Sequence, residues 1–219
     1  MHDSFSPAWI SKMAARNDPE KIRFRLTLRF SMLYFVLFAL GILLCRRTWL
    51  GSLSVWQTNI QALLTSPFTE CVRARDYIRV LLRCSRFEMM LLAMLTVSGM
   101  TYFSRTASGA LLAAHAFLFG CMSCRLLTDL LAGNPATPHG NLVFFVYFFA
   151  KWIQAAILLA VAAEAVCFSY EYRDAGRALR AKQNNIVVQF SLCAVSDAGI
   201  LLIARTMQTL LMAFLLRLR

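Results

Sequence analysis

Five long apolar runs recur along the chain, separated by stretches in which charged and polar residues gather. An α-helix needs ~20 apolar residues to cross a bilayer, and these runs come close to or exceed that length. The pattern therefore predicts an all-α, polytopic membrane helix bundle with about five transmembrane helices in one membrane domain, residues 30–216. The predicted spans are 30–45, 87–104, 106–124, 142–170 and 186–216.

The residues before the first run, 1–29, form a basic N-terminal segment with two helix-start signals. Ser6 precedes Pro7, and Asp18 precedes Pro19, an order typical of a capping residue followed by proline in the first helical turn. We expect a short helix on the membrane surface and then a helix that continues into the first span. The leader lacks the apolar core of a signal peptide, so we expect insertion by an uncleaved first helix.

A long polar loop, residues 46–86, separates the first two spans and contains its own helical pattern. Its basic residues recur at spacings of four, four and three, which places them on one helix face: Arg75, Arg79, Arg83 and Arg86. We predict an interfacial helix that runs into the second span. The basic stripe would contact either lipid headgroups or a partner protein.

The second and third spans are separated only by Arg105 and its polar neighbours, which predicts a tight hairpin. Small residues in this hairpin, including Gly99, Gly109 and Gly120, favour close helix contacts. The next interruption, LLAGNPATPHGN at 130–141, has the proline, glycine and asparagine content of a loop.

The amino-acid composition supports the assignment to a membrane and favours lipid over nucleic acid as the binding partner. Of the 219 residues, 59% are hydrophobic, above the roughly 45–50% of ordinary soluble domains. The formal charge is +12, but the basic residues gather at the ends of apolar runs. That placement favours anionic lipid headgroups over nucleic acid. Basic residues divide almost equally between the two sides, so charge does not orient the chain.

Two charges lie inside the fourth span, Lys151 and Glu164. They are thirteen residues apart, about 20 Å along a helix, and point to nearly opposite sides, so they cannot pair with each other. We expect Lys151 to lie near one end of the span and to extend towards the headgroups. Glu164 ends a stripe of small residues, Ala156 and Ala160, which predicts a packing face against another helix.

The fifth span supplies possible partners for Glu164. Its polar arc contains Asp197, Arg205 and Gln208, and the favoured arrangement pairs Arg205 with Glu164 or Asp197. These groups would either hold helices together or line a proton or solute pathway. His115, alone among apolar residues of the third span, is interpreted as a packing residue rather than a ligand.

No catalytic or nucleotide-binding motif occurs in the sequence. The C-M-S-C spacing at 121–124 has no second pair, and we interpret these cysteines as buried packing residues. We therefore expect no enzyme activity, no cofactor and no metal site, and the residues identify no small-molecule substrate.

The order of these parts resembles the stage II sporulation protein M family. The segments that carry the resemblance are RFRLTLRFSMLYFVLFALGILL and RFEMMLLAMLTVSGMTYFSRTASGALLAAHAFLFG. In the second, Gly99 lies before the hairpin turn and Gly120 closes the following helix. The chain departs from the family where Arg105 occupies the turn in place of proline, and where GNPATPHGN precedes the fourth span.

The resemblance implies a multi-pass protein of the bacterial cell membrane with its N-terminus inside. It also implies a non-catalytic scaffold that recruits membrane or cell-wall proteins, such as wall hydrolases, during sporulation. The residues alone leave a second function open. A transporter, or the permease subunit of an ATP-driven exporter, would use Glu164, Asp197 and Arg205.

Overall fold

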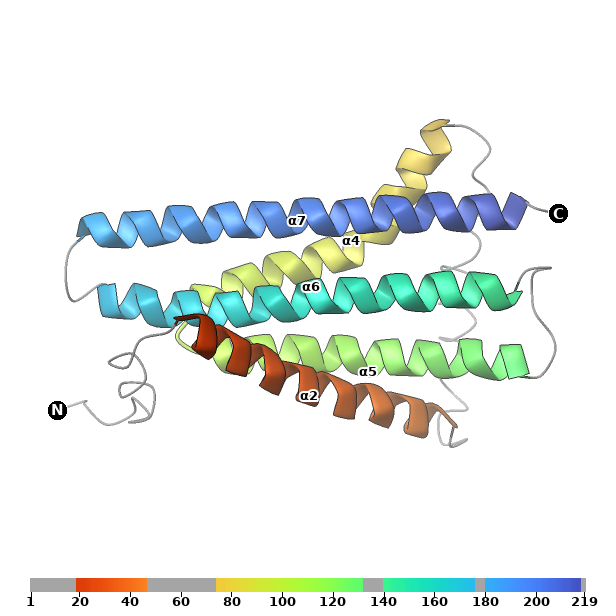
Figure 1. Cartoon of the computed structure of the whole chain (residues 1–219), viewed down its shortest axis with the longest axis horizontal. Coiled ribbons are helices and arrows are strands. Elements are labelled where there is room, and N and C mark those ends of the chain that lie inside the picture. The colour runs from red at the N-terminus through yellow and green to blue at the C-terminus, as the bar shows by residue number, and fades with distance from the viewer. Residues whose placement is uncertain (1–18, 47–73, 132–139, 176–179, 218–219) are drawn as a thin grey trace.

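The computed structural model describes residues 19–46, 74–131, 140–175 and 180–217, which fold into five helices (Figure 1). The helices are α2 (Pro19–Arg46), α4 (Ala74–Gly99), α5 (Ser104–Leu131), α6 (Gly140–Ala175) and α7 (Arg180–Arg217). No strand occurs in these ranges, so the all-helical prediction is confirmed. The predicted surface helix before Pro19 and residues 47–73 of the first loop lie outside the described residues, as do 132–139 of the second loop.

Consecutive helices run in opposite directions (Figure 1). The start of α2, the α4–α5 turn, the end of α6 and the start of α7 lie at one end of the bundle, here called the Pro19 end. The end of α2, the start of α4 and the end of α7 lie at the other, the Arg46 end. The first turns of α4 stand away from the remaining helices at the Arg46 end.

Four helices contain segments long and apolar enough to cross a membrane: Lys21–Leu44, Ser104–Cys124, Phe145–Arg173 and Asn184–Met212. The chain is thus a helical membrane protein with four candidate spans. α4 is not among these helices, because its apolar part is limited to residues 87–99, which follow the basic stripe. Thirteen residues reach about 20 Å, less than the ~30 Å hydrocarbon core. Five spans therefore stay a prediction.

The turn between α4 and α5 lies at residues 100–103, a few residues before the predicted position. α4 ends at Gly99 because the turn is stabilised by its own backbone bonds, Met100 N–H to Val97 O and Thr101 N–H to Ser98 O, both 3.0 Å. Arg105 consequently lies in the first turn of α5 rather than in the turn itself.

Arg173 near the end of α6 holds this turn in place. Its Nη2 donates to the carbonyl oxygens of Tyr102, at 2.8 Å, and Thr101, at 3.3 Å. The guanidinium group also lies over the Tyr102 ring, 4.4 Å from its centroid, which adds a cation–π contact. The α4–α5 hairpin is therefore fixed to α6 at the Pro19 end.

The core has one aromatic layer and one glycine contact that join α2 to its neighbours. Phe38 of α2 and Phe119 of α5 pack around Trp152 of α6, with ring centroids 5.0–5.7 Å apart. Close by, Gly41 of α2 and Gly120 of α5 bring the two backbones together. A methyl group on Gly41 would lie 2.5 Å from the Phe117 carbonyl oxygen, and one on Gly120 would overlap the Phe38 carbonyl oxygen.

The outer surface of α7 is apolar, with Val195, Ile203 and Phe214 more than 60% exposed. In a soluble protein such a surface would be an association site, but on a membrane span it is the face that contacts lipid. Several polar groups, including Lys151, Gln154 and Arg205, are instead buried inside the bundle.

We predict opposite effects of one substitution at two glycines. Gly120→Ala should lower the free energy of unfolding by about 1–3 kcal/mol, because the added methyl group overlaps a backbone carbonyl. Gly199→Ala on α7, where nothing lies within 4 Å, should raise stability by up to ~1 kcal/mol through helix propensity. Thermal unfolding in detergent, followed by circular dichroism, measures both. Equal effects at the two sites would contradict the α2–α5 contact.

Candidate intramembrane charge site

A cluster of buried polar side chains lies between α4, α6 and α7. It consists of Glu88, Lys151, Gln154, Arg205 and Gln208, and we call it the charged cluster. Each of these residues is at most 7% exposed. The Glu88 carboxylate accepts from both Lys151 Nζ and Arg205 Nη2, so one acid joins three helices.

Helical spacing explains why these residues face inward. On α7, Leu201, Arg205, Gln208 and Met212 follow at intervals of four, three and four, and all are buried. On α6, Lys151, Gln154, Ala155 and Leu158 form the corresponding buried stripe, and on α4 the stripe is Ser85, Glu88, Leu92 and Leu95. Each polar group thus replaces one apolar member of an inward stripe.

The two glutamines extend the cluster. Gln208 Oε1 accepts from Arg205 Nη1 at 2.7 Å and from Gln154 Nε2 at 2.9 Å. Within the charged cluster, four buried atoms find no hydrogen-bond partner among the described residues: Glu88 Oε2, Gln154 Oε1, Arg205 Nε and Gln208 Nε2. Buried polar atoms are usually satisfied, so the cluster has capacity for further polar contacts.

His115 joins the remaining two helices. Its Nδ1 lies 2.9 Å from the hydroxyl of Tyr34 on α2, and both residues are buried. The imidazole also stacks on Phe87, with centroids 6.2 Å apart. These contacts account for a packing role. Among the described residues, no group of three or more His, Cys, Asp or Glu side chains is arranged to hold a metal ion.

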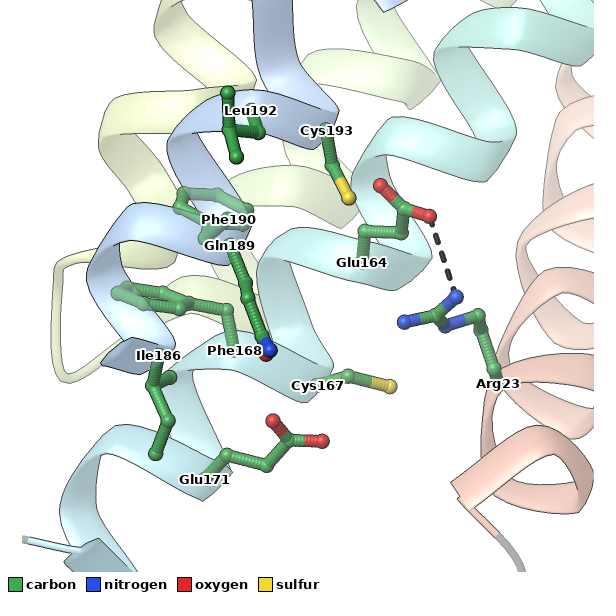
Figure 2. A pocket seen from close by; sticks show the side chains of 10 residues that line it. All are labelled: Arg23, Glu164, Cys167, Phe168, Glu171, Ile186, Gln189, Phe190, Leu192 and Cys193. Carbon is green, nitrogen blue, oxygen red and sulfur yellow. Dashed lines mark ion pairs between the residues drawn. The ribbon is translucent and has the colours of Figure 1, made fainter. Parts of the chain in front are cut away.

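A second polar site lies towards the Pro19 end, where a groove of about 360 Å³ opens between α2, α6 and α7 (Figure 2). Figure 2 shows Arg23 reaching from α2 towards Glu164 of α6, and their Nη1 and Oε1 atoms are 3.4 Å apart. Glu171 and Gln189 also line the groove. Asp197 of α7 interacts electrostatically with Glu164, and its Oδ2 finds no hydrogen-bond partner among the described residues.

These contacts correct the predicted pairing of the embedded charges. Arg205 pairs with Glu88 of α4, and Glu164 pairs with Arg23 of α2, so the favoured pairing of Arg205 with Glu164 or Asp197 is wrong. The reason is that α4 packs against both α6 and α7 and brings a carboxylate to Arg205.

The prediction that Lys151 reaches the headgroups is also wrong. Its side chain is 8% exposed and is held by Glu88 within the bundle. The Ala156 and Ala160 stripe likewise lies on the exposed side of α6 rather than in a helix contact, because the neighbouring stripe that begins with Lys151 and Gln154 faces inward.

Sequence reasoning missed Glu88, the centre of the cluster, because it was assigned to the boundary of the second span. A signal was present. Glu88 lies two residues after Arg86, about 200° around the helix, and therefore opposite the basic stripe. In the structure Arg79, Arg83 and Arg86 are exposed, as an outward-facing stripe requires. The side chain of Arg75 lies outside the described set.

No family model matches the chain, and neither the curated proteins nor the solved structures give a match. The resemblance to the stage II sporulation protein M family therefore stays a prediction.

We predict that Glu88 and Arg205 are energetically coupled and that Glu164 and Arg205 are not. Removing one member of a buried ion pair leaves the other charge unpaired, which is costly. The double change Glu88→Ala with Arg205→Ala should therefore destabilise the protein by less than the sum of the single changes, with a coupling energy above about 0.5 kcal/mol.

The matched control is the pair Glu164→Ala with Arg205→Ala, whose effects should add within about 0.5 kcal/mol. All variants are compared by thermal unfolding in the same detergent. Additive effects at Glu88 and Arg205, or coupling between Glu164 and Arg205, would contradict the observed arrangement.

Proposed function

We propose that this chain is a non-enzymatic scaffold of the cell membrane that binds other membrane or cell-wall proteins. The observation that carries the proposal is the closed pairing of Glu88 with Lys151 and Arg205. Charges that move a solute must be reachable from water during transport. These three side chains are instead at most 8% exposed and hold α4, α6 and α7 together. Because these ion pairs hold the helices in place, the bundle would keep the same outer surface available for partner proteins.

The basic stripe of α4 is the surface we propose for the partner. Arg79, Arg83 and Arg86 are exposed on a helix whose first turns stand away from the bundle (Figure 1). Ile78, Leu82 and Phe87, each at least 50% exposed, lie beside them. Arginine and aromatic residues such as Phe87 are enriched at protein–protein interfaces. A partner with an acidic and partly apolar surface would complement it.

The resemblance described above narrows the class of partner. It supports cell-wall hydrolases as the recruited proteins and sporulation as the setting. The fixed bundle and the projecting stripe are compatible with that role.

Site-specific photo-crosslinking in native membranes tests the scaffold proposal. A photoreactive amino acid at Arg79 or Arg83 should give discrete protein adducts, because these positions lie on the proposed docking face. The matched control places the same amino acid at Val195 or Ile203, which are exposed on the lipid-facing side of α7 and should give lipid adducts. Mass spectrometry identifies the adducts.

Wall hydrolases among the stripe adducts would support the proposed partner class. Lipid adducts at both the stripe and the α7 positions would show that the stripe contacts headgroups, and the docking face would then be wrong.

A transporter, or the permease subunit of an exporter, is the second candidate. The observation that favours it is the set of buried polar atoms in the charged cluster that have no hydrogen-bond partner within the described helices, together with the groove beside Glu164. A pathway would require polar contacts of this kind inside the membrane.

Flux measurements on the purified protein in liposomes separate the two candidates. A scaffold should give no proton or chloride flux above that of protein-free vesicles, at any imposed gradient. Flux that disappears in Glu164→Gln or Arg205→Met, while both variants keep their helical circular dichroism, would favour the transporter.

A further inference from the structure

An open groove of about 450 Å³ lies between α2 and α5 at the Pro19 end of the bundle. Its apolar wall is formed by Leu26, Phe30 and Leu33 of α2. The polar side chains that line it are Arg29 of α2 with Arg105 and Thr106 of α5, and no acidic residue is among the described residues that line it. The floor is Gly109, where the helix presents no side chain.

Space is available in this groove because Gly109 makes no tight contact. Among the described residues, a methyl group placed on Gly109 would meet only the Phe30 ring, at 3.9 Å. At the other end of the same helix pair, Gly41 and Gly120 already hold the two backbones in contact. α2 and α5 are thus in backbone contact near the Arg46 end and leave an opening near the Pro19 end.

The basic side chains of the groove lie nearer the Pro19 end than its deepest apolar residues do. Arg105 and Thr106 belong to the first turn of α5, so they lie at the end of that candidate span, where headgroups are expected. Leu33 lies four residues beyond Arg29, and Gly109 four beyond Arg105, about 6 Å deeper in each case. A ligand with a negative group at one end and a hydrocarbon portion at the other would complement this lining.

We propose that this groove binds one anionic phospholipid. The phosphate lies between the guanidinium groups of Arg29 and Arg105, with the Thr106 hydroxyl as a further donor. An acyl chain follows the groove across Phe30, Leu33 and Gly109. Arginine is suited to this role because its planar donors match phosphate oxygens. Basic pockets between transmembrane helices are a known mode of headgroup recognition. The site does not depend on the scaffold proposal.

Native mass spectrometry of the full chain, released from detergent in the presence of defined lipids, tests the proposal. Phosphatidylglycerol should bind in a one-to-one complex, at least roughly tenfold more tightly than phosphatidylcholine. Both lipids have the phosphate, but the choline ammonium of phosphatidylcholine cancels its negative charge and would be repelled by Arg29 and Arg105. Glycerol phosphate, which has the headgroup charge without acyl chains, should neither bind nor compete.

Two kinds of variant test the two halves of the site. The double change Arg29→Gln with Arg105→Gln should abolish the preference for phosphatidylglycerol. Gly109→Leu should fill the groove and weaken the binding of both phospholipids. The matched controls are Lys21→Gln with Arg25→Gln on α2, which removes two exposed charges that do not line the groove, and Gly199→Leu on the exposed face of α7. Both controls should bind like the parent chain.

Three results would overturn the proposal. The first is equal binding of the two phospholipids, and the second is an equal loss of binding in the Lys21 and Arg25 control. The third is full competition by glycerol phosphate, which would indicate a site for a free phosphate group. Circular dichroism of each variant confirms that a loss of binding does not come from a loss of the fold.

Discussion

The pairing of Glu88 with Lys151 and Arg205 is the interaction on which the arrangement of α4, α6 and α7 depends. α4 is the least apolar of the five described helices, and its apolar residues 87–99 are too few to span a bilayer alone. Packing of small and apolar side chains would therefore bind α4 only weakly to the neighbouring helices, because no hydrophobic force drives helices together in lipid. A carboxylate shared by two cations gives α4 a fixed depth and rotation, because any shift would separate charges in a low-dielectric interior. Glu88 thus locates a helix that its hydrophobicity cannot locate.

The other half of the bundle is held by different means. α2 and α5 meet through the Gly41–Gly120 contact and through the Tyr34–His115 hydrogen bond, and aromatic rings join them to α6. These contacts are short-range and directional, so they fix the distance between α2 and α5 at one end and leave the Pro19 end open. The groove with Arg29 and Arg105 follows from this uneven packing. A bilayer lipid is always present beside such an opening, whereas a soluble ligand would have to reach it from the headgroup layer.

Much of the fold could be predicted from the sequence, because apolar length and helix-start signals act locally. Pro19 begins α2 as the Asp18–Pro19 pair predicts, and four of the five predicted runs lie in helices able to span a membrane. The choice of partners could not be predicted in the same way. Helical periodicity states which residues share a face, but it does not state which neighbouring helix that face meets. Arg205 was correctly expected to need an acid, yet Glu88, Glu164 and Asp197 were all chemically suitable. The fold selects among them by placing α4 against both α6 and α7.

The two polar sites along α6 differ in a way that bears on function. At Lys151 the charge is buried and paired on the inward face, whereas Glu164, about 20 Å away along the helix, is 21% exposed and faces an open groove. The first is suited to holding helices, since its ion pairs would have to break before a helix could move. The second is suited to contact with something outside the bundle, since Arg23 is half exposed and can exchange its partner at little cost. The charges within α6 therefore do not form one continuous path. They separate into an interior pair that stabilises the bundle and a peripheral pair that faces the surroundings.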